Sequence, residues 1–518
     1  MFTTFQNEPV ANFSDEGPRH RMQDSLGRVA GDLGRVYPLV IAGQRIETQL
    51  HAPSRNPARL SQVVGIACVA PVEMADRAVQ AATDAFGPWS HTPVETRARY
   101  LVKTAAILRR RAYTFAAWIV LESSKNWYEA YADVAEAIDF LEFYAREAGR
   151  WFQPGPTTPW PGEENEVFRQ SIGVGAIISP WNFPLAILCG MTAAAIVTGN
   201  TVVLKPAEQT PVIAAKFMEL LESASLPPGV VNLLFGAGEI VGEALTTHPQ
   251  IRFVSFTGSK DVGLHINQRI AVPQPGQKWI KRGIFEMGGK NAIVVDSDVN
   301  LDLAASEIIV SAYGFQGQKC SACSRLIAVD AIYDTLLDKV VERASKLTVG
   351  DPSNFSNYLG AVIDDAAYNK IIGYIAIGRS EGQVLLGGTD TEETNEGGYF
   401  VHPAVIADVA PSARIAQEEI FGPVLAVMRA GSFEEAMTIA NSTEFGLTGA
   451  LYSNNRAHLE YARHEFNVGN LYLNRKCTGA AVDVQPFGGF NMSGANSKAG
   501  GRDYLGLFLQ TKSVSERW

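Results

Sequence analysis

Hydrophobic side chains in the first third of the chain recur every three or four residues, which is the spacing of one face of a helix. This pattern predicts helices over 73–86, 95–123 and 128–148. In the second of them, the recurring apolar residues are Leu101, Ala105, Leu108, Ala112 and Phe115. Residues 1–36 are polar and show no sustained period, so we expect an arm that lies over the surface.

A different pattern runs from 172 to 272, where short apolar runs alternate with helical spacing. The apolar runs predict strands at 174–179, 201–204, 230–234 and 252–256. Helical spacing fills the gaps at 185–198, 208–223, 239–246 and 260–271. Strands that alternate with helices predict βαβ units and a parallel sheet that is covered on both faces.

A second alternating region follows, with strands predicted at 292–295 and 325–329, a helix at 331–347, and further elements to about 473. Residues 153–166 contain four prolines and cannot be helical, so we interpret them as a linker or an exposed excursion. The residues after Gly494 resemble a strand-like extension, which we expect at an oligomer contact.

Length and charge narrow the class of protein. A chain of 518 residues is longer than one hydrophobic core usually serves, so two or three domains are expected. The net charge of -10 disfavours a nucleic acid or an anionic membrane as the main partner. The most apolar stretch, 185–197, is too short to span a bilayer, and the acidic N-terminus lacks the apolar core of a targeting signal. Five cysteines fit a reducing compartment better than a disulfide scaffold, so we expect a soluble cytoplasmic protein.

One cysteine lies among glycines and beside a lysine, in residues 314–325. Glycine allows a backbone to approach a ligand closely, and nearby positive charge favours a thiolate. The motif alone leaves four interpretations of Cys320: a nucleophile, a buried thiol, a redox pair with Cys323, or a zinc ligand. Zinc needs a second closely spaced set of ligands, and the other cysteines are scattered singly, so no metal is expected.

Two predicted strand ends carry groups suited to a dinucleotide, which binds where helix N-termini meet phosphates. After one strand, the amides around Gly258 and the Ser259 hydroxyl would bind a pyrophosphate; the alternative is an ordinary turn with a serine N-cap. After another strand come Lys205 and Glu208. A carboxylate that accepts from ribose hydroxyls would repel a 2′-phosphate, so Glu208 favours NAD over NADP, unless it is only a solvated residue at a helix start.

Six short motifs follow one another along the chain: Pro180-Trp181-Asn182-Phe183-Pro184, Leu204-Lys205-Pro206-Ala207-Glu208, Phe256-Thr257-Gly258-Ser259, Glu286-Met287-Gly288-Gly289-Lys290, Gly317-Gln318-Lys319-Cys320 and Glu418-Glu419-Ile420-Phe421-Gly422-Pro423. With these motifs in this order, the chain resembles the aldehyde dehydrogenase superfamily over nearly its full length. Within the superfamily, residues 315–322 and 474–494 are similar to a subgroup that oxidises L-glutamate γ-semialdehyde to L-glutamate with NAD. Ser124 stands where a glycine is more usual.

The resemblance implies an α/β fold with two parallel-sheet domains, one NAD-binding and one catalytic, plus a small oligomerisation arm. The implied divisions are an N-terminal arm at 1–36, the NAD-binding domain at 37–150 and 171–284, an oligomerisation excursion at 151–170, the catalytic domain at 285–493 and an oligomerisation tail at 494–518. We therefore expect a homodimer or a higher homo-oligomer.

Aldehyde oxidation needs a nucleophile, because an aldehyde has no leaving group. The resemblance makes Cys320 the thiolate that forms a thiohemiacetal and then a thioester. It makes Asn182 an oxyanion donor and Glu286 the base that activates water. The implied cofactor contacts are Lys205, Glu208, Thr257, Gly258, Ser259, Gly263, Glu419 and Phe421.

The same resemblance implies a substrate pocket. Ser321 and the amides of Gly479 and Ala480 would bind the α-carboxylate. Phe183 and Phe487 would line the aliphatic stem, and Glu136 would attract the ammonium group. The alternatives are a plain turn at Gly479-Ala480, a solvated helix face at Glu136, and a different ω-semialdehyde or amino-aldehyde as substrate. A non-catalytic protein on the same fold is a further alternative, which the joint presence of Cys320, Glu286 and Asn182 disfavours.

Overall fold

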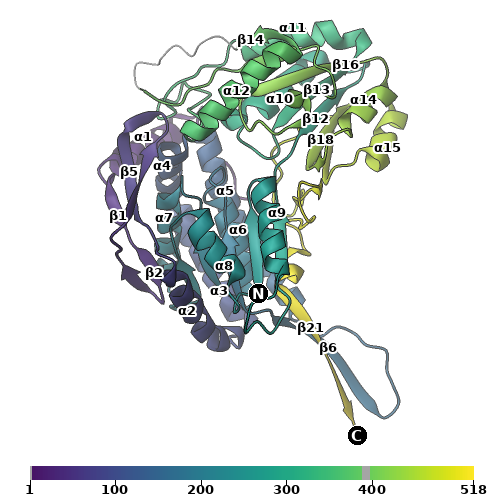
Figure 1. The fold of residues 1–518 in the computed structure, drawn as a ribbon. Coiled ribbons are helices and arrows are strands. Elements are labelled where there is room, and N and C mark those ends of the chain that lie inside the picture. The colour runs from purple at the N-terminus through teal and green to yellow at the C-terminus, as the bar shows by residue number, and fades with distance from the viewer. Residues whose placement is uncertain (1–2, 388–396) are drawn as a thin grey trace.

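Two seven-stranded sheets organise the computed structural model, which describes residues 3–387 and 397–518 (Figure 1). The first sheet has the order β11-β10-β7-β8-β9-β2-β3. Its strands are β11 (Arg282–Glu286), β10 (Phe253–Thr257), β7 (Val174–Ile178), β8 (Thr201–Lys205), β9 (Val231–Leu233), β2 (Leu39–Ile41) and β3 (Gln44–Ile46). The run from β11 to β9 is parallel, as the alternation of strands and helices predicts.

Helices cover both faces of this sheet. Those after its strands are α6 (Ala186–Val197), α7 (Pro211–Ser223), α8 (Glu243–Thr247) and α9 (Lys260–Ala271). Earlier in the chain come α2 (Glu73–Ser90), α3 (Val94–Arg110), α4 (Ala112–Ser123) and α5 (Trp127–Trp151). The single helix predicted over 95–123 is wrong, because the chain breaks at Arg111 (φ -106°, ψ 12°). Buried residues continue in step across the break, so the periodicity alone does not reveal it.

The second sheet has the order β14-β15-β16-β13-β12-β18-β19 and is parallel except at β14. Its strands are β14 (Gln383–Leu386), β15 (Ala404–Ala407), β16 (Val424–Ala430), β13 (Cys323–Val329), β12 (Asn291–Val295), β18 (Thr448–Tyr452) and β19 (Asn470–Leu473). Its helices are α10 (Leu301–Tyr313), α11 (Tyr333–Ala344), α12 (Asp365–Glu381), α13 (Arg414–Gln417), α14 (Phe433–Ala440) and α15 (Arg456–Glu465). The predicted α/β class with two largely parallel sheets is confirmed.

Residues 1–36, for which periodicity predicts no element, contain helix α1 (Glu16–Ala30). Its buried positions Met22, Ser25 and Val29 keep helical spacing, but charged neighbours mask the signal. Phe13, before the helix, is fully buried, and its ring lies 5.6 Å from that of Trp127. The N-terminal segment is therefore part of the core of the first half.

A two-stranded ribbon projects from the body (Figure 1). It pairs β6 (Glu163–Ser171) antiparallel with β21 (Leu509–Arg517), and the proline-rich residues before β6 are not helical, as predicted. The extension predicted after Gly494 begins only at Leu509. Before it the chain enters the core, where Phe508 is fully buried against Phe253 (ring centroids 5.4 Å apart).

Smaller elements complete the fold. They are a three-stranded sheet of β1 (Arg35–Tyr37), β5 (Arg59–Cys68) and β4 (His51–Asn56), and a pair of β17 (Phe445–Gly446) with β20 (Phe490–Asn491). Within the described ranges, no helix combines the length and the apolarity that crossing a membrane requires.

Candidate active site

The carboxyl end of the first sheet faces the amino end of the second, because the chain passes directly from one to the other. Glu286 is the last residue of β11, and Asn291 is the first residue of β12. Cys320 lies just before β13, at the same edge as the start of β12. Since parallel strands bring equivalent ends to one edge, these residues come together between the sheets. We treat this junction as the candidate active site.

Cys320 stands in a strained turn, residues 314–322, which we call the nucleophile loop. Phe315, Gln316 and Gly317 all have positive φ (52°, 55° and 67°), a conformation that costs a non-glycine residue roughly 1–2 kcal/mol. Hydrogen bonds hold the strained turn. The Gln316 amide donates to the carbonyls of Ser124 (3.1 Å) and Ala361 (2.8 Å). The loop is therefore fixed by α4 and by the second half of the chain together.

The surroundings of Cys320 disfavour a free thiolate. Asn291 Nδ2 donates to the Cys320 carbonyl (2.8 Å), which fixes the backbone. Burial raises the pKa of the Cys320 thiol above its ordinary value, and the carboxylates of Glu286 and Glu419 raise it further. The thiol must therefore lose a proton before its sulfur attacks a carbonyl.

Glu286 is buried at the junction, with the backbone of Gly494 bridged to its own. Its Oε2 accepts a long hydrogen bond from Ser497 Oγ (3.5 Å). Its Oε1 has no hydrogen-bond partner among the described residues. Burial raises the pKa of Glu286 well above its ordinary value. A buried carboxyl group with one open oxygen is suited to hold and transfer a proton.

Asn182 is also brought to the nucleophile loop. It is buried, and its Nδ2 donates to the carbonyl of Gln318 (3.2 Å), two residues before the cysteine. An amide nitrogen has two N–H groups, so one remains available for an oxyanion. Asn182, Glu286 and Cys320 are far apart in the sequence and share one junction in the fold.

Lys205 and Glu208 lie at the carboxyl end of β8. Lys205 Nζ is 3.4 Å from Glu208 Oε1, and the same oxygen accepts from the amide of Gly238 (3.0 Å). Glu208 is half exposed but tied to two partners, so it is not a freely solvated residue. Burial lowers the pKa of Lys205.

The turn after β10 contains the serine N-cap that was one of the two interpretations of its sequence. Ser259 caps α9, because its hydroxyl accepts from the amide of Val262 (3.4 Å). Thr257 Oγ1 lies 3.7 Å from the sulfur of Met191. A side chain at Gly258 would meet the ring of Phe256 at 2.5 Å, and one at Gly263 would meet the sulfur of Met287. The Gly258 amide donates to the Glu286 carbonyl (3.1 Å), so it is not free for a phosphate, and the binding of a pyrophosphate at this turn stays a prediction.

Glu419 approaches from the loop before β16. Its Oε1 accepts from the amide of Gly289 (2.8 Å), and a side chain at Gly288 would collide with the carboxylate. Burial raises the pKa of Glu419. Phe421, at φ 61°, sets its ring edge-on to Trp181 with centroids 5.5 Å apart. The predicted cofactor residues thus gather at the junction from both sheets.

Lys125 is a buried residue of this region that the sequence reasoning missed. Its Nζ lies 2.8 Å from Asp133 Oδ2, 3.9 Å from the centroid of Phe183 and 4.8 Å from that of Phe315. Burial lowers the pKa of Lys125. The available signal was a lysine between two strongly apolar helical segments, where a charge needs a partner.

On the substrate side, the residues predicted to bind the α-carboxylate lie on adjoining loops. The carbonyl of Ser321 accepts from Cys477 Sγ (3.5 Å) and from Thr448 Oγ1 (3.3 Å). Gly479 follows shortly after that cysteine, with φ 78°. Ser321 and the Gly479-Ala480 turn are therefore held next to each other.

Glu136 and Phe487 complete the predicted substrate set. Glu136 lies on the partly buried face of α5, where burial and then Asp133 raise its pKa to about 8 while Lys125 lowers it. The backbone of Phe487 exchanges two hydrogen bonds of 2.8 Å with that of Ala499. No contact between Glu136 and Phe487 is recorded in the described parts of the chain, so their shared role remains a prediction.

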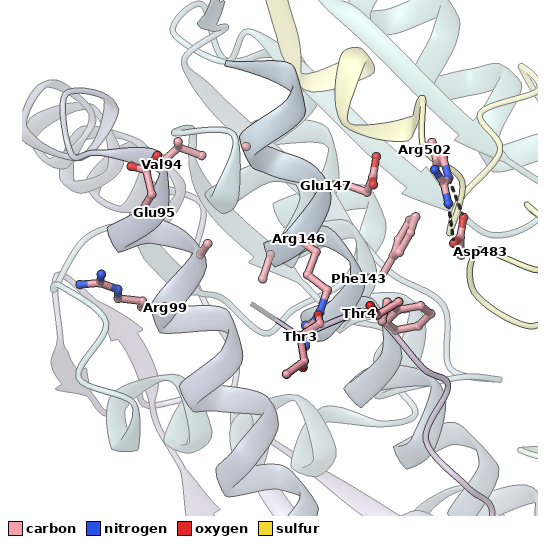
Figure 2. Close-up of a pocket in the computed structure, with 14 residues that line it drawn as sticks. Thr3, Thr4, Val94, Glu95, Arg99, Phe143, Arg146, Glu147, Asp483 and Arg502 are labelled. Carbon is pink, nitrogen blue, oxygen red and sulfur yellow. Dashed lines mark hydrogen bonds and ion pairs between the residues drawn. The ribbon is translucent and has the colours of Figure 1, made fainter. Parts of the chain in front are cut away.

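A cavity of about 570 Å³ lies elsewhere (Figure 2). Its wall combines the N-terminal segment, α3, α5 and the Asp483–Arg502 ion pair. Both signs of charge line it, and none of its lining residues is a predicted site residue.

The aldehyde dehydrogenase family model matches residues 46–514, and the chain belongs to the aldehyde dehydrogenase family. It is 54% identical over 516 residues to 1-pyrroline-5-carboxylate dehydrogenase of Geobacillus thermodenitrificans (strain NG80-2), with 100% of both chains covered. It is 52% identical to the protein of the same name from Bacillus subtilis (strain 168), again over 100% of both chains. A solved structure of 1-pyrroline-5-carboxylate dehydrogenase from Thermus with bound NAD shares 50% identity, covers 100% of both chains and superposes with a TM-score of 0.98.

Proposed function

We propose that the protein oxidises L-glutamate γ-semialdehyde, formed from 1-pyrroline-5-carboxylate, to L-glutamate with NAD, in the catabolism of proline and arginine. The observation that carries this proposal is the junction itself. There Asn182 reaches the nucleophile loop, a buried Glu286 keeps one oxygen open, and Ser321 is held beside the Gly479 turn. Full-length relatives at 52–54% identity carry the name of this activity.

The groups at the junction fit NAD. The Glu208 carboxylate would accept from ribose hydroxyls and would repel a 2′-phosphate. The turn at Gly258 and Ser259 leads into the N-terminus of α9, which would favour a pyrophosphate there. Glu419 uses one oxygen for Gly289, which leaves the other for the second ribose. When bound, NAD supplies the hydride acceptor.

The chain's own residues supply the remaining chemistry. Cys320 passes its thiol proton to water, its sulfur bonds to the aldehyde carbon, and the C=O π electrons move to the carbonyl oxygen, which becomes an oxyanion. The free N–H of Asn182 and the Cys320 amide donate to that oxyanion in the thiohemiacetal. After oxidation to a thioester, Glu286 takes a proton from water, the resulting hydroxide attacks, and the Cys320 sulfur departs with a proton. The raised pKa of Glu286 suits this transfer.

Steady-state kinetics with a panel of aldehydes tests the substrate. We expect the highest kcat/KM for glutamate γ-semialdehyde, with lower values for other ω-semialdehydes, amino-aldehydes and neutral aldehydes. Higher kcat/KM for a different semialdehyde would favour that alternative instead.

We further propose that the protein is a cytoplasmic homodimer or higher homo-oligomer. The cysteines are all free, which supports a reducing compartment. Trp160 and Trp518 are 66% and 76% exposed at the projecting ribbon, which supports contact with a second copy there. Light scattering of the wild type and of a Trp160→Glu, Trp518→Glu double variant tests this, with a lower mass expected for the variant.

A further inference from the structure

The turn at residues 478–480, which we call the anion turn, follows the last strand of the second sheet. Asn474 begins the connection in a left-handed conformation (φ 54°), and its side chain bonds to the backbone of Ser453. Cys477 then ties the connection to Ser321. The anion turn is therefore placed beside the nucleophile loop by bonds that precede it.

Arg475 lies on the outer side of this turn. A single nitrogen of its guanidinium, Nη2, donates to the carbonyl of Thr478 (3.2 Å) and to the carbonyl of Gly479 (3.3 Å). The guanidinium carbon also lies 4.5 Å from the centroid of the Tyr472 ring. The guanidinium group thus packs on the ring of Tyr472 and donates to two successive carbonyls.

The directions of the Thr478 and Gly479 carbonyls also fix the directions of the next two amides. In a trans peptide the C=O of one residue points opposite to the N–H of the next. The carbonyls of Thr478 and Gly479 face Arg475, so the N–H groups of Gly479 and Ala480 face away from it. Within residues 3–387 and 397–518, neither amide donates to an acceptor. Two adjacent free amides of this kind form an anion-binding concavity.

We infer that Arg475 is a positioning residue: it turns the Gly479 and Ala480 amides toward the substrate's carboxylate without touching the substrate. This inference rests on the proposed function, because the carboxylate concerned is that of glutamate γ-semialdehyde. Arg475 acts through orientation, since the nitrogen that meets the turn, Nη2, donates to the two carbonyls behind it.

The Arg475→Met variant tests the inference with three measurements. For glutamate γ-semialdehyde we expect kcat/KM to fall about tenfold or more, the effect of weakening hydrogen bonds to a charged group. The inhibition constant of L-glutamate against oxidation of pentanal should rise by a similar factor. Oxidation of pentanal itself, which has no carboxylate, should stay within about twofold of the wild type. A purely structural role would lower both oxidations together and would overturn the inference.

Lys476→Met is the control for charge, because it removes the same charge from a side chain that also lies against Gly479, 3.6 Å from Nζ to where a Cβ would stand, and leaves the two carbonyls bonded to Arg475. We expect less than about a threefold change in any of the three measurements. A loss equal to that of Arg475→Met would mean that charge, and not orientation, binds the anion, and would also overturn the inference.

The two proposals fail in distinguishable ways. If the wild type oxidises pentanal better than glutamate γ-semialdehyde, the proposed substrate is wrong, while inhibition by L-glutamate still tests Arg475. If L-glutamate does not inhibit the wild type at all, the anion turn does not bind a carboxylate and the inference falls as well.

Discussion

Both seven-stranded sheets are largely parallel, but the polar residues at their carboxyl ends differ in how many hydrogen bonds they make within the protein. In the first sheet, β11 ends at Glu286, which is buried with one oxygen unbonded among the described residues. In the second, β12 is followed by Asp296, which accepts from Ser297 N (2.7 Å) and Ser453 Oγ (2.8 Å) and lies 2.6 Å from His458 Nδ1. Ligands of open α/β sheets usually bind at the carboxyl ends.

The difference teaches that position in the sheet is not sufficient for a site. At the carboxyl end of the second sheet, Asp296 is satisfied by hydrogen bonds within the protein, whereas at that of the first sheet Glu286 keeps one oxygen unbonded among the described residues. The two acids have opposite pKa shifts for this reason. Burial raises the pKa of Glu286. Burial opposes the shift of Asp296, but hydrogen bonds from His458 and Ser453 hold its pKa below the ordinary value.

Removing the nucleophile should break the function of the junction most completely. We expect Cys320→Ala to lower kcat by roughly 10⁴-fold or more, because no thiohemiacetal forms. Binding of NAD, followed by fluorescence titration, should be unchanged. Cys323→Ser is the control, since Cys323 is buried in the second core and donates to the Arg325 carbonyl. Comparable loss in that variant would indicate a redox pair in place of a single nucleophile.

Replacing Glu286 and Asp296 by their amides should affect turnover very differently. Glu286→Gln is expected to lower kcat about 10²–10⁴-fold, because water is no longer activated. Mass spectrometry of the quenched reaction should find the acyl group on Cys320. Asp296→Asn should leave kcat nearly unchanged. A matching fall in both variants would show that the two edges are equally involved in turnover.

The same pair should respond to pH with opposite signs. The pKa of Glu286 is higher in the folded than in the unfolded protein, so its protonated form stabilises the fold below the unfolded pKa, and this contribution is lost as pH rises through the folded pKa. The Glu286→Gln variant does not lose it and should therefore gain stability relative to the wild type toward alkaline pH. The pKa of Asp296 is lower in the folded than in the unfolded protein, so its ionised form stabilises the fold above the unfolded pKa, and this contribution is lost as pH falls through the folded pKa. Asp296→Asn should therefore cost most near neutrality, about 1–3 kcal/mol, and least in acid.

Urea unfolding of the wild type and both variants across acid, neutral and alkaline pH measures these differences. If the stability difference from the wild type changed with pH in the same direction in both variants, the contrast between Glu286, with one unbonded oxygen, and the fully hydrogen-bonded Asp296 would be contradicted.

Much of this arrangement was predictable from local patterns. Apolar runs and helical spacing are local, and they located β7, β8, β10 and the helices between them. The break at Arg111 was not predictable, because buried positions keep helical spacing from α3 into α4, which is buried on nearly all sides. The burial of Phe13 depends on Trp127, more than a hundred residues away, and no local pattern records such a contact.

The candidate site divides in the same way. The resemblance placed Cys320, Glu286 and Asn182 in one site, and the fold brings them to one junction. Lys125 and Arg475 were missed, because their roles depend on partners from other segments or on the direction of carbonyls. The same sequence that marked Gly479 and Ala480 as donors carries no sign of what orients them.

Substitution of Ser124 should have the smallest effect on stability, and it tests how the nucleophile loop is supported. It ends α4 at φ 58°, a conformation that glycine adopts without strain, and so the usual glycine of the family would fit there. Its hydroxyl accepts from the Ala361 amide (2.9 Å), and its carbonyl accepts from Gln316 of the nucleophile loop. Relief of strain should stabilise by about 1–2 kcal/mol, and leaving the Ala361 amide without its acceptor should cost about 1–3 kcal/mol, so Ser124→Gly should change the unfolding free energy by less than about 2 kcal/mol.

Ser124→Ala separates the two contributions, because it removes the hydroxyl and keeps the strain. It leaves the buried Ala361 amide without its acceptor and should destabilise by about 1–3 kcal/mol in urea unfolding. Since the carbonyl bond to Gln316 survives in both variants, kcat should stay within about twofold in each. If Ser124→Gly were as destabilising as Ser124→Ala, the left-handed strain would be negligible and the hydroxyl alone would account for the serine. If kcat fell in both, the hydroxyl would belong to the support of the nucleophile loop.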